Sequence, residues 1–147
     1  MSSCKVHSTV SWIFQWIAAV ILLQTLFFKF TGAPESRFIF TTLGVEPWGR
    51  IGTGLMELLA VGLLLWNRSA VLGALLSLGL MVGALASHLT RLGIIVQDDG
   101  GLLFALAMTV FGSSAIVIWL RRYELPYVGT LMFSGHQADC SLSPKRS

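Results

Sequence analysis

Charged residues are scarce in this sequence. Only 12% of its 147 residues are Asp, Glu, Lys or Arg, against roughly a quarter in an average soluble domain, while 54% are hydrophobic. The net charge is +3, but the ten Lys and Arg residues are scattered along the chain. A nucleic-acid-binding face needs clustered cations, so this class of protein is excluded. The composition instead predicts an integral membrane protein built as one compact unit.

The residues that most often bind metals or carry catalysis are also rare. The two cysteines, Cys4 and Cys140, lie in the polar tails and form no CxxC pair or other metal-ligand spacing. Histidines and carboxylates do not gather in a ligand pattern, so we expect no metal site. The sequence contains no phosphate-binding loop, no GxSxG or HExxH motif and no haem-attachment motif. No cofactor is therefore evident from motifs.

Hydrophobic runs fill most of the chain. They predict four membrane-spanning helices at about residues 10–30, 47–66, 70–90 and 100–121. Each is near the ~20 residues that a bilayer crossing needs. A polar lead (1–9) precedes this transmembrane domain (10–122), and a tail (123–147) that we expect to be mostly disordered follows it. The predicted fold is an all-α membrane protein, a four-transmembrane-helix bundle with both termini on the same side, which we expect to be cytoplasmic.

Glycine, proline and serine indicate where the chain turns and where helices approach one another. The connection at 31–49 combines turn-forming glycines and prolines with apolar residues, so we expect a loop that packs onto the bundle or lies in the membrane interface. Pro47 suits the first turn of the second span. In the third span, Gly79, Gly83 and Ser87 recur every four residues, a pattern that lets helices pack closely in lipid.

The few charges near the spans gather at the outer end of the predicted bundle. In an up-and-down arrangement, the end of the first helix, the start of the second, the end of the third and the start of the fourth all meet there. This candidate polar cluster comprises Lys29, Arg50, Glu57, His88 and Arg91. Asp98 and Asp99 lie at the same end and are predicted to cap the fourth helix.

Glu57 is the most informative member of this cluster. It lies seven residues after Arg50, about 10 Å deeper along the helix, and an apolar run follows it. A carboxylate near hydrocarbon must be neutralised or paired, and the basic residues of the cluster are the candidate partners. Two interpretations stay open. Glu57 either ties helices together, or it handles a ligand, a proton or a quinone.

The other members of the cluster have simpler interpretations as well. Lys29 can extend toward the lipid headgroups without any further role. His88 can be an interfacial or capping histidine rather than a ligand. Arg91 can compensate the end of its helix or contact a phospholipid. The residue types alone do not choose between these roles and a shared functional site.

Four short motifs lie at the ends of the predicted spans. They are FFKF at 27–30, GVEPW at 44–48, GTGLMELLA at 52–60 and GALASH at 83–88. In these motifs, and over about residues 10–120, the chain resembles the DoxX-like family (DoxX/DoxD superfamily) of small four-helix membrane proteins. The resemblance implies a bundle in the cytoplasmic membrane, mostly of bacteria. Some such proteins are linked to quinone-coupled oxidation of sulfur compounds and others to oxidative-stress assemblies. Relatives that exchange thiols use an intramembrane cysteine pair, which this chain lacks.

Three classes of function follow from this sequence. The first is a membrane subunit of a quinone-linked oxidoreductase, in which a quinone is the cofactor, Glu57 and His88 move protons, and Lys29 or Arg91 holds an anionic donor. Electrons would come from a membrane or soluble redox partner subunit. The second is binding or transport of a small molecule or lipid, which with four spans requires a homo-oligomer. The third is a structural or assembly subunit without chemistry. All three place the protein in a lipid bilayer.

Overall fold

A computed structural model describes residues 2–96 and 98–122, and over these residues the regular structure is entirely helical. Four of the helices are long and apolar enough to cross a membrane. They are α1 (Ser2–Thr31), α3 (Trp48–Leu65), α4 (Ala70–Ser87), which continues into the π-helical turn η1 (His88–Leu92), and α5 (Leu102–Leu120). The predicted all-α fold with four membrane-spanning helices is therefore confirmed. The tail expected to be disordered, 123–147, lies outside the described residues.

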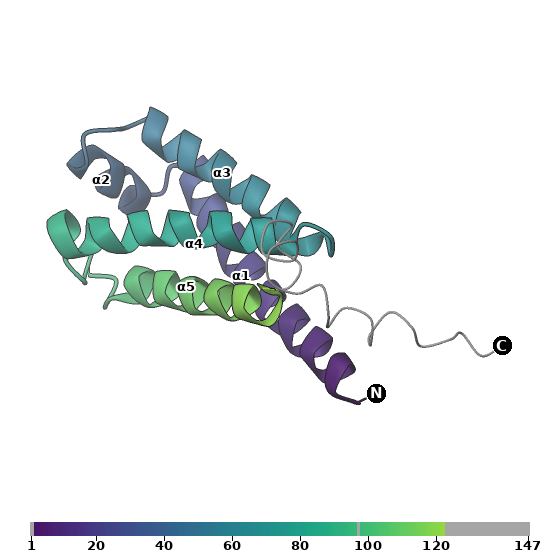
Figure 1. Cartoon of the computed structure of the whole chain (residues 1–147). Coiled ribbons are helices and arrows are strands. Elements are labelled where there is room, and N and C mark those ends of the chain that lie inside the picture. Colours follow the sequence, from purple (N-terminus) through teal and green to yellow (C-terminus); the bar gives the residue numbers. More distant parts are fainter. Residues whose placement is uncertain (1, 97, 123–147) are drawn as a thin grey trace.

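The four long helices form a ring in which each packs against two others. α1 contacts α3 and α5, and α4 contacts the same two helices from the other side (Figure 1). The core contains small side chains that are fully buried, Ala18 and Ala19 on α1, Ala60 on α3 and Ala74 on α4. Short side chains let helix backbones approach closely, which is the main source of helix association in lipid.

Large apolar side chains cover the outside of the ring. Trp48 is exposed at the start of α3, whereas Trp66 and Trp119 are exposed at the opposite end of the bundle. Tryptophan is enriched at the headgroup level of membranes, so these residues mark the two edges of the apolar zone. Trp16 is exposed on α1 as well.

The connection predicted as a loop contains a short helix, α2 (Pro34–Thr42). Proline in the first turn, followed by Glu35, favours a helix start, because proline needs no N–H there and a carboxylate suits the helix N-terminus. Ser36 and Phe40, one turn apart, are buried. α2 contacts α1, α3 and η1 (Figure 1). The expected packing of this connection onto the bundle is therefore confirmed, whereas its helix was not predicted, because nine residues are too few to give a clear helical pattern in the sequence.

Two other boundaries differ from the sequence prediction. α1 begins at Ser2, inside the predicted polar lead, because neither glycine nor proline interrupts the lead. Pro47 directly precedes α3, which starts at Trp48. At the end of the third span, η1 ends at Leu92 and is followed by Gly93, whose φ of 78° is positive, a backbone conformation that glycine adopts without strain.

α3 and α4 approach closely at Gly73. A Cβ atom on this residue would lie 2.4 Å from the backbone N of Leu64 and 2.9 Å from the carbonyl O of Ala60. Gly79 and Gly83, by contrast, are exposed, and a Cβ on either would meet no described atom within 4 Å. The expected close packing at these two glycines was therefore wrong within this chain. A helix that is apolar on every side does not reveal which of its small residues face inward.

Candidate functional site

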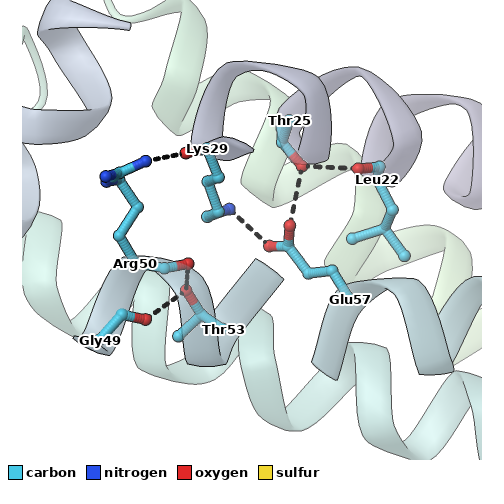
Figure 2. Close-up of polar contacts among 7 residues, drawn as sticks. All are labelled: Leu22, Thr25, Lys29, Gly49, Arg50, Thr53 and Glu57. Carbon is cyan, nitrogen blue, oxygen red and sulfur yellow. Dashed lines mark hydrogen bonds and ion pairs between the residues drawn. The ribbon is translucent and has the colours of Figure 1, made fainter. Parts of the chain in front are cut away.

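An ion pair joins α1 to α3 inside the membrane-spanning region. The Lys29 ammonium group donates a hydrogen bond to Glu57 Oε1 at 2.7 Å (Figure 2). The Glu57 side chain is 4% exposed and that of Lys29 16% exposed. Of the four basic residues of the predicted cluster, Lys29 is thus the partner of Glu57. The pair is shielded on the carboxylate side and closer to the surface on the ammonium side.

Thr25 completes the surroundings of the Glu57 carboxylate. Its hydroxyl lies 3.2 Å from Glu57 Oε2 and 3.0 Å from the carbonyl O of Leu22, one helical turn earlier (Figure 2). Both carboxylate oxygens therefore have a donor on α1. Thr25 was not among the predicted site residues, although its position four residues before Lys29 places both on one face of a helix.

Arg50 forms a second ion pair next to the first. Its Nε donates to Glu46 Oε1 at 2.8 Å. Its Nη1 donates to the backbone carbonyl of Lys29 (Figure 2). Carbonyl groups in the last turn of a helix have no partner within the helix, so Arg50 caps the end of α1. Glu46 was not predicted as a site residue, although its i,i+4 spacing from Arg50 is the signal of such a pair.

The two ion pairs together carry no net charge. Lys29 and Arg50 supply two positive charges, and Glu57 and Glu46 supply two negative charges. Glu46 Oε2 is buried and has no hydrogen-bond partner among the described residues. If Glu57 takes up a proton, Lys29 becomes a partly buried cation without a counter-charge. The site can then bind a group that is anionic or that carries a strong hydrogen-bond acceptor.

The remaining predicted residues lie elsewhere at this end of the bundle. His88 is buried, its Nδ1 donates to the carbonyl O of Gly93 at 2.9 Å, and its ring meets the Phe104 ring edge-to-face at 5.8 Å. Arg91 is exposed on η1. Within the described part of the chain, no hydrogen bond or ion pair connects His88 or Arg91 to Glu57. The structure therefore divides the predicted cluster into an α1–α3 site and a separate histidine at the η1–α5 connection.

Comparison of the chain with family models, with curated proteins and with solved structures finds no match.

The chemistry that the α1–α3 site supports follows from its contacts. Among the described residues, no group of three or more His, Cys, Asp or Glu is placed to hold a metal ion. The groups present, one carboxylate, one ammonium and one hydroxyl, can exchange a proton and donate hydrogen bonds to a small polar group.

Asp99 organises the start of α5. Its carboxylate accepts hydrogen bonds from the backbone N–H groups of Val96, Gly101 and Leu103 at 2.9 to 3.0 Å. Burial raises the pKa of Asp99, but the three N–H donors and the charge of nearby His88 favour its ionised form. The net result is a pKa below the ordinary value of an aspartate.

We expect the Asp99→Ala variant to lose about 1 kcal/mol of unfolding free energy at neutral pH, the usual loss for a capping carboxylate. Because the pKa is lower in the folded state, this stabilisation is complete above the unfolded-state pKa and disappears as the pH falls through the folded-state pKa. The free energies of unfolding of wild type and variant, measured by unfolding titrations, should therefore converge at acid pH. Asp98→Asn is the control, because Asp98 is exposed and asparagine tolerates its left-handed backbone conformation, with a φ of 62°. A difference that persists in acid, or an equal loss in the control, contradicts this role.

A second polar cluster lies at the opposite end of the bundle. Arg121 donates from Nε to Ser11 Oγ at 2.8 Å, and from its two terminal nitrogens to the carbonyl O and the side-chain Oδ1 of Asn67 at 2.8 and 2.6 Å. Gln15 Nε2 also donates to Ser11 Oγ at 2.7 Å. Arg121 thus connects α1, the α3–α4 turn and α5. These residues were not predicted as a site, because their partners are far apart in the sequence.

Proposed function

We propose that this chain is a DoxX-like protein of the bacterial cytoplasmic membrane that serves as the membrane subunit of a quinone-linked oxidoreductase. The observation that carries the proposal is the Glu57 carboxylate, buried in a membrane-spanning helix, paired with Lys29 and bonded by Thr25. Ionisable residues inside a membrane are costly, and proton or ligand handling is their usual function.

The proposed chemistry uses the two members of the ion pair differently. A quinone carries two carbonyl oxygens, and it becomes a quinol by taking up two electrons and two protons. The Lys29 ammonium, the more exposed partner, would hold a bound quinone by donating a hydrogen bond to one of its oxygens. Glu57 would supply the protons that the quinone takes up on reduction. The electrons come from a redox partner subunit.

The test is native mass spectrometry with quinone extraction of the protein purified from membranes, in parallel for wild type, Glu57→Gln and Glu35→Gln. Glu35→Gln is the matched control, since Glu35 lies on α2 and outside both ion pairs. We expect stoichiometric quinone in wild type and control, and its loss from a Glu57→Gln variant that still folds. Quinone missing from the wild type, or retained in all three, contradicts the proposal. A Glu57→Gln variant that is only less stable identifies the ion pair as a helix clamp.

We further propose that both termini lie on the cytoplasmic side. An even number of spans returns the chain to its starting side, and Lys5, Arg68, Arg121 and Arg122 then lie near the cytoplasmic face. The opposite end carries as many cations, Lys29, Arg37, Arg50 and Arg91, but Lys29 and Arg50 are paired within the bundle, so the unpaired cations among the described residues there are fewer and the positive-inside rule favours this orientation. Cys4 and Cys140 allow a direct test. A membrane-impermeant thiol reagent should label neither in intact cells and both after permeabilisation. Labelling of either cysteine in intact cells contradicts this orientation.

A further inference from the structure

Three polar atoms inside the bundle, on three different helices, have no hydrogen-bond partner among the described residues. They are Gln15 Oε1 on α1, Ser77 Oγ on α4 and Ser114 Oγ on α5. Each of these residues is 0% exposed. Unpaired polar groups are strongly unfavourable in an apolar interior, and in folded proteins nearly all bind protein groups or ordered water.

Other hydroxyl groups on the same two helices behave differently. Ser87 on α4 donates to the carbonyl O of Gly83 at 2.8 Å, and Thr109 on α5 donates to that of Ala105 at 2.9 Å. Both bonds reach back four residues along the helix, the usual solution for a hydroxyl in lipid. Ser77 and Ser114, which face the interior, do not use it.

Ser77 and Ser114 lie at the same level of the bundle. The ring contact between His88 and Phe104 aligns α4 with the antiparallel α5 at one end. Ser77 is eleven residues before His88, and Ser114 is ten residues after Phe104. At the rise of an α-helix, both serines are therefore about 15 Å from the ring contact.

Ser77 is also level with Glu57. Gly73 lies against Ala60 and Leu64 of α3, and Ser77 is one turn further along the same face of α4. Because α3 runs antiparallel to α4, the α3 residues level with Ser77 are those about one turn before Ala60 to Leu64, the stretch 57–60 that begins with Glu57. Glu57 is buried at this level.

Gln15 extends the row of polar groups toward the other end of the bundle. Its Nε2 is bonded to Ser11, which also accepts from Arg121. Gln15 lies one helical turn further into the bundle than Ser11, which leaves its Oε1 as an acceptor between the Arg121 cluster and the two serines. Polar groups thus occur at successive levels from Arg121 to Glu57.

We propose that Gln15, Ser77 and Ser114 bind ordered water, and that this water forms a proton path between Glu57 and the Arg121 end of the bundle. A bound water molecule needs two to four polar partners. The two serine hydroxyls at one level supply two of them for one molecule, and the Gln15 amide oxygen is an acceptor for the next along the row. A proton enters the row at the Arg121 end and reaches Glu57 through the water, where it replaces a proton that Glu57 gives up in the proposed function, so protons and charge balance. The path rests on the proposed proton-handling function of Glu57, whereas the water site does not.

The first test is water-edited solid-state NMR of isotope-labelled protein in bilayers. We expect magnetisation transfer from water to Ser77 and Ser114 in the wild type. In the Ser77→Ala/Ser114→Ala double variant, transfer to the neighbouring core residues should be lost. The matched double variant Ser87→Ala/Thr109→Ala replaces hydroxyls that already have carbonyl partners. This variant should keep the magnetisation transfer from water to the core residues. Absence of transfer in the wild type, with both hydroxyls bonded to the carbonyls four residues earlier, overturns the proposal.

The second test uses acidified samples, in which carboxyl groups are protonated. It measures the rate at which the Glu57 carboxyl exchanges with D₂O, read from the infrared carboxyl stretching band that is absent in Glu57→Gln. We expect slower exchange in the Ser77→Ala/Ser114→Ala variant and an unchanged rate in the Ser87→Ala/Thr109→Ala control. An unchanged exchange rate in the Ser77→Ala/Ser114→Ala variant means that protons reach Glu57 from the outer end of the bundle, which contradicts the proposed path. Quinone content is measured on the same samples, so that failure of the water path can be told apart from failure of the proposed quinone function. If the interior holds no water, quinone binding at the Lys29–Glu57 site is still expected.

Discussion

Replacing Glu57 with leucine is expected to lower the free energy of unfolding by about 3 kcal/mol, at the lower end of the range for breaking a buried ion pair. The variant leaves the Lys29 ammonium group without its counter-charge and the Thr25 hydroxyl with one fewer acceptor. The value stays at the lower end because the Lys29 side chain is partly exposed and can turn toward the headgroups. Reversible unfolding in mixed detergent micelles measures the change.

A double-mutant cycle separates the ion pair from the packing of its side chains. Lys29→Met alone leaves a buried carboxylate, which can become neutral by taking up a proton. The combined Lys29→Met/Glu57→Leu variant should recover most of the lost stability, since replacing both charges by apolar groups is often neutral or favourable. Single-variant losses that simply add would show that the two residues do not interact in the folded protein.

The second large effect is expected at Gly73. In Gly73→Ala, the new Cβ would overlap backbone atoms of Leu64, Leu63 and Ala60, which cannot rotate away as a side chain can. α3 and α4 must separate, and we expect a loss of about 3 kcal/mol, the upper part of the usual range for overpacking. The same detergent titration gives the value.

Gly79→Ala and Gly83→Ala are the matched controls on the same helix. A Cβ at either position meets open space within the described chain, and alanine is the better helix former by about 1 kcal/mol. These variants should be as stable as the wild type or slightly more stable. A loss at Gly79 or Gly83 equal to that at Gly73 would contradict the packing of α3 against α4 found in the structure.

The sequence predicted the four spans well because hydropathy and length are local properties of the chain. It did not predict the contacts between the spans. The partner of Glu57 lies 28 residues away on another helix, so choosing Lys29 over Arg50 or His88 requires the register of α1 against α3. Gly73 could not be ranked above Gly79 for the same reason. Both belong to an apolar helix, and only its rotation decides which of them faces α3.

The polar residues of the interior were missed for a related reason. Ser77 and Ser87 look equivalent in the sequence, each a serine in an apolar run. One is buried without a protein partner, and the other bonds to its own helix. Thr25 and Glu46, in contrast, carried a usable signal, because each lies four residues before a basic member of the predicted cluster.

The central claim is that Lys29 and Glu57 are paired within the bilayer, with the carboxylate buried between α1 and α3. The most direct measurement is a solid-state NMR distance between ¹⁵N at Lys29 Nζ and ¹³C at Glu57 Cδ in lipid bilayers. The 2.7 Å contact between Nζ and Oε1 predicts a strong dipolar coupling, which Thr25→Val should preserve. No coupling in the wild type, with the Lys29 ammonium group close to lipid phosphorus instead, would contradict the pair and the site built on it.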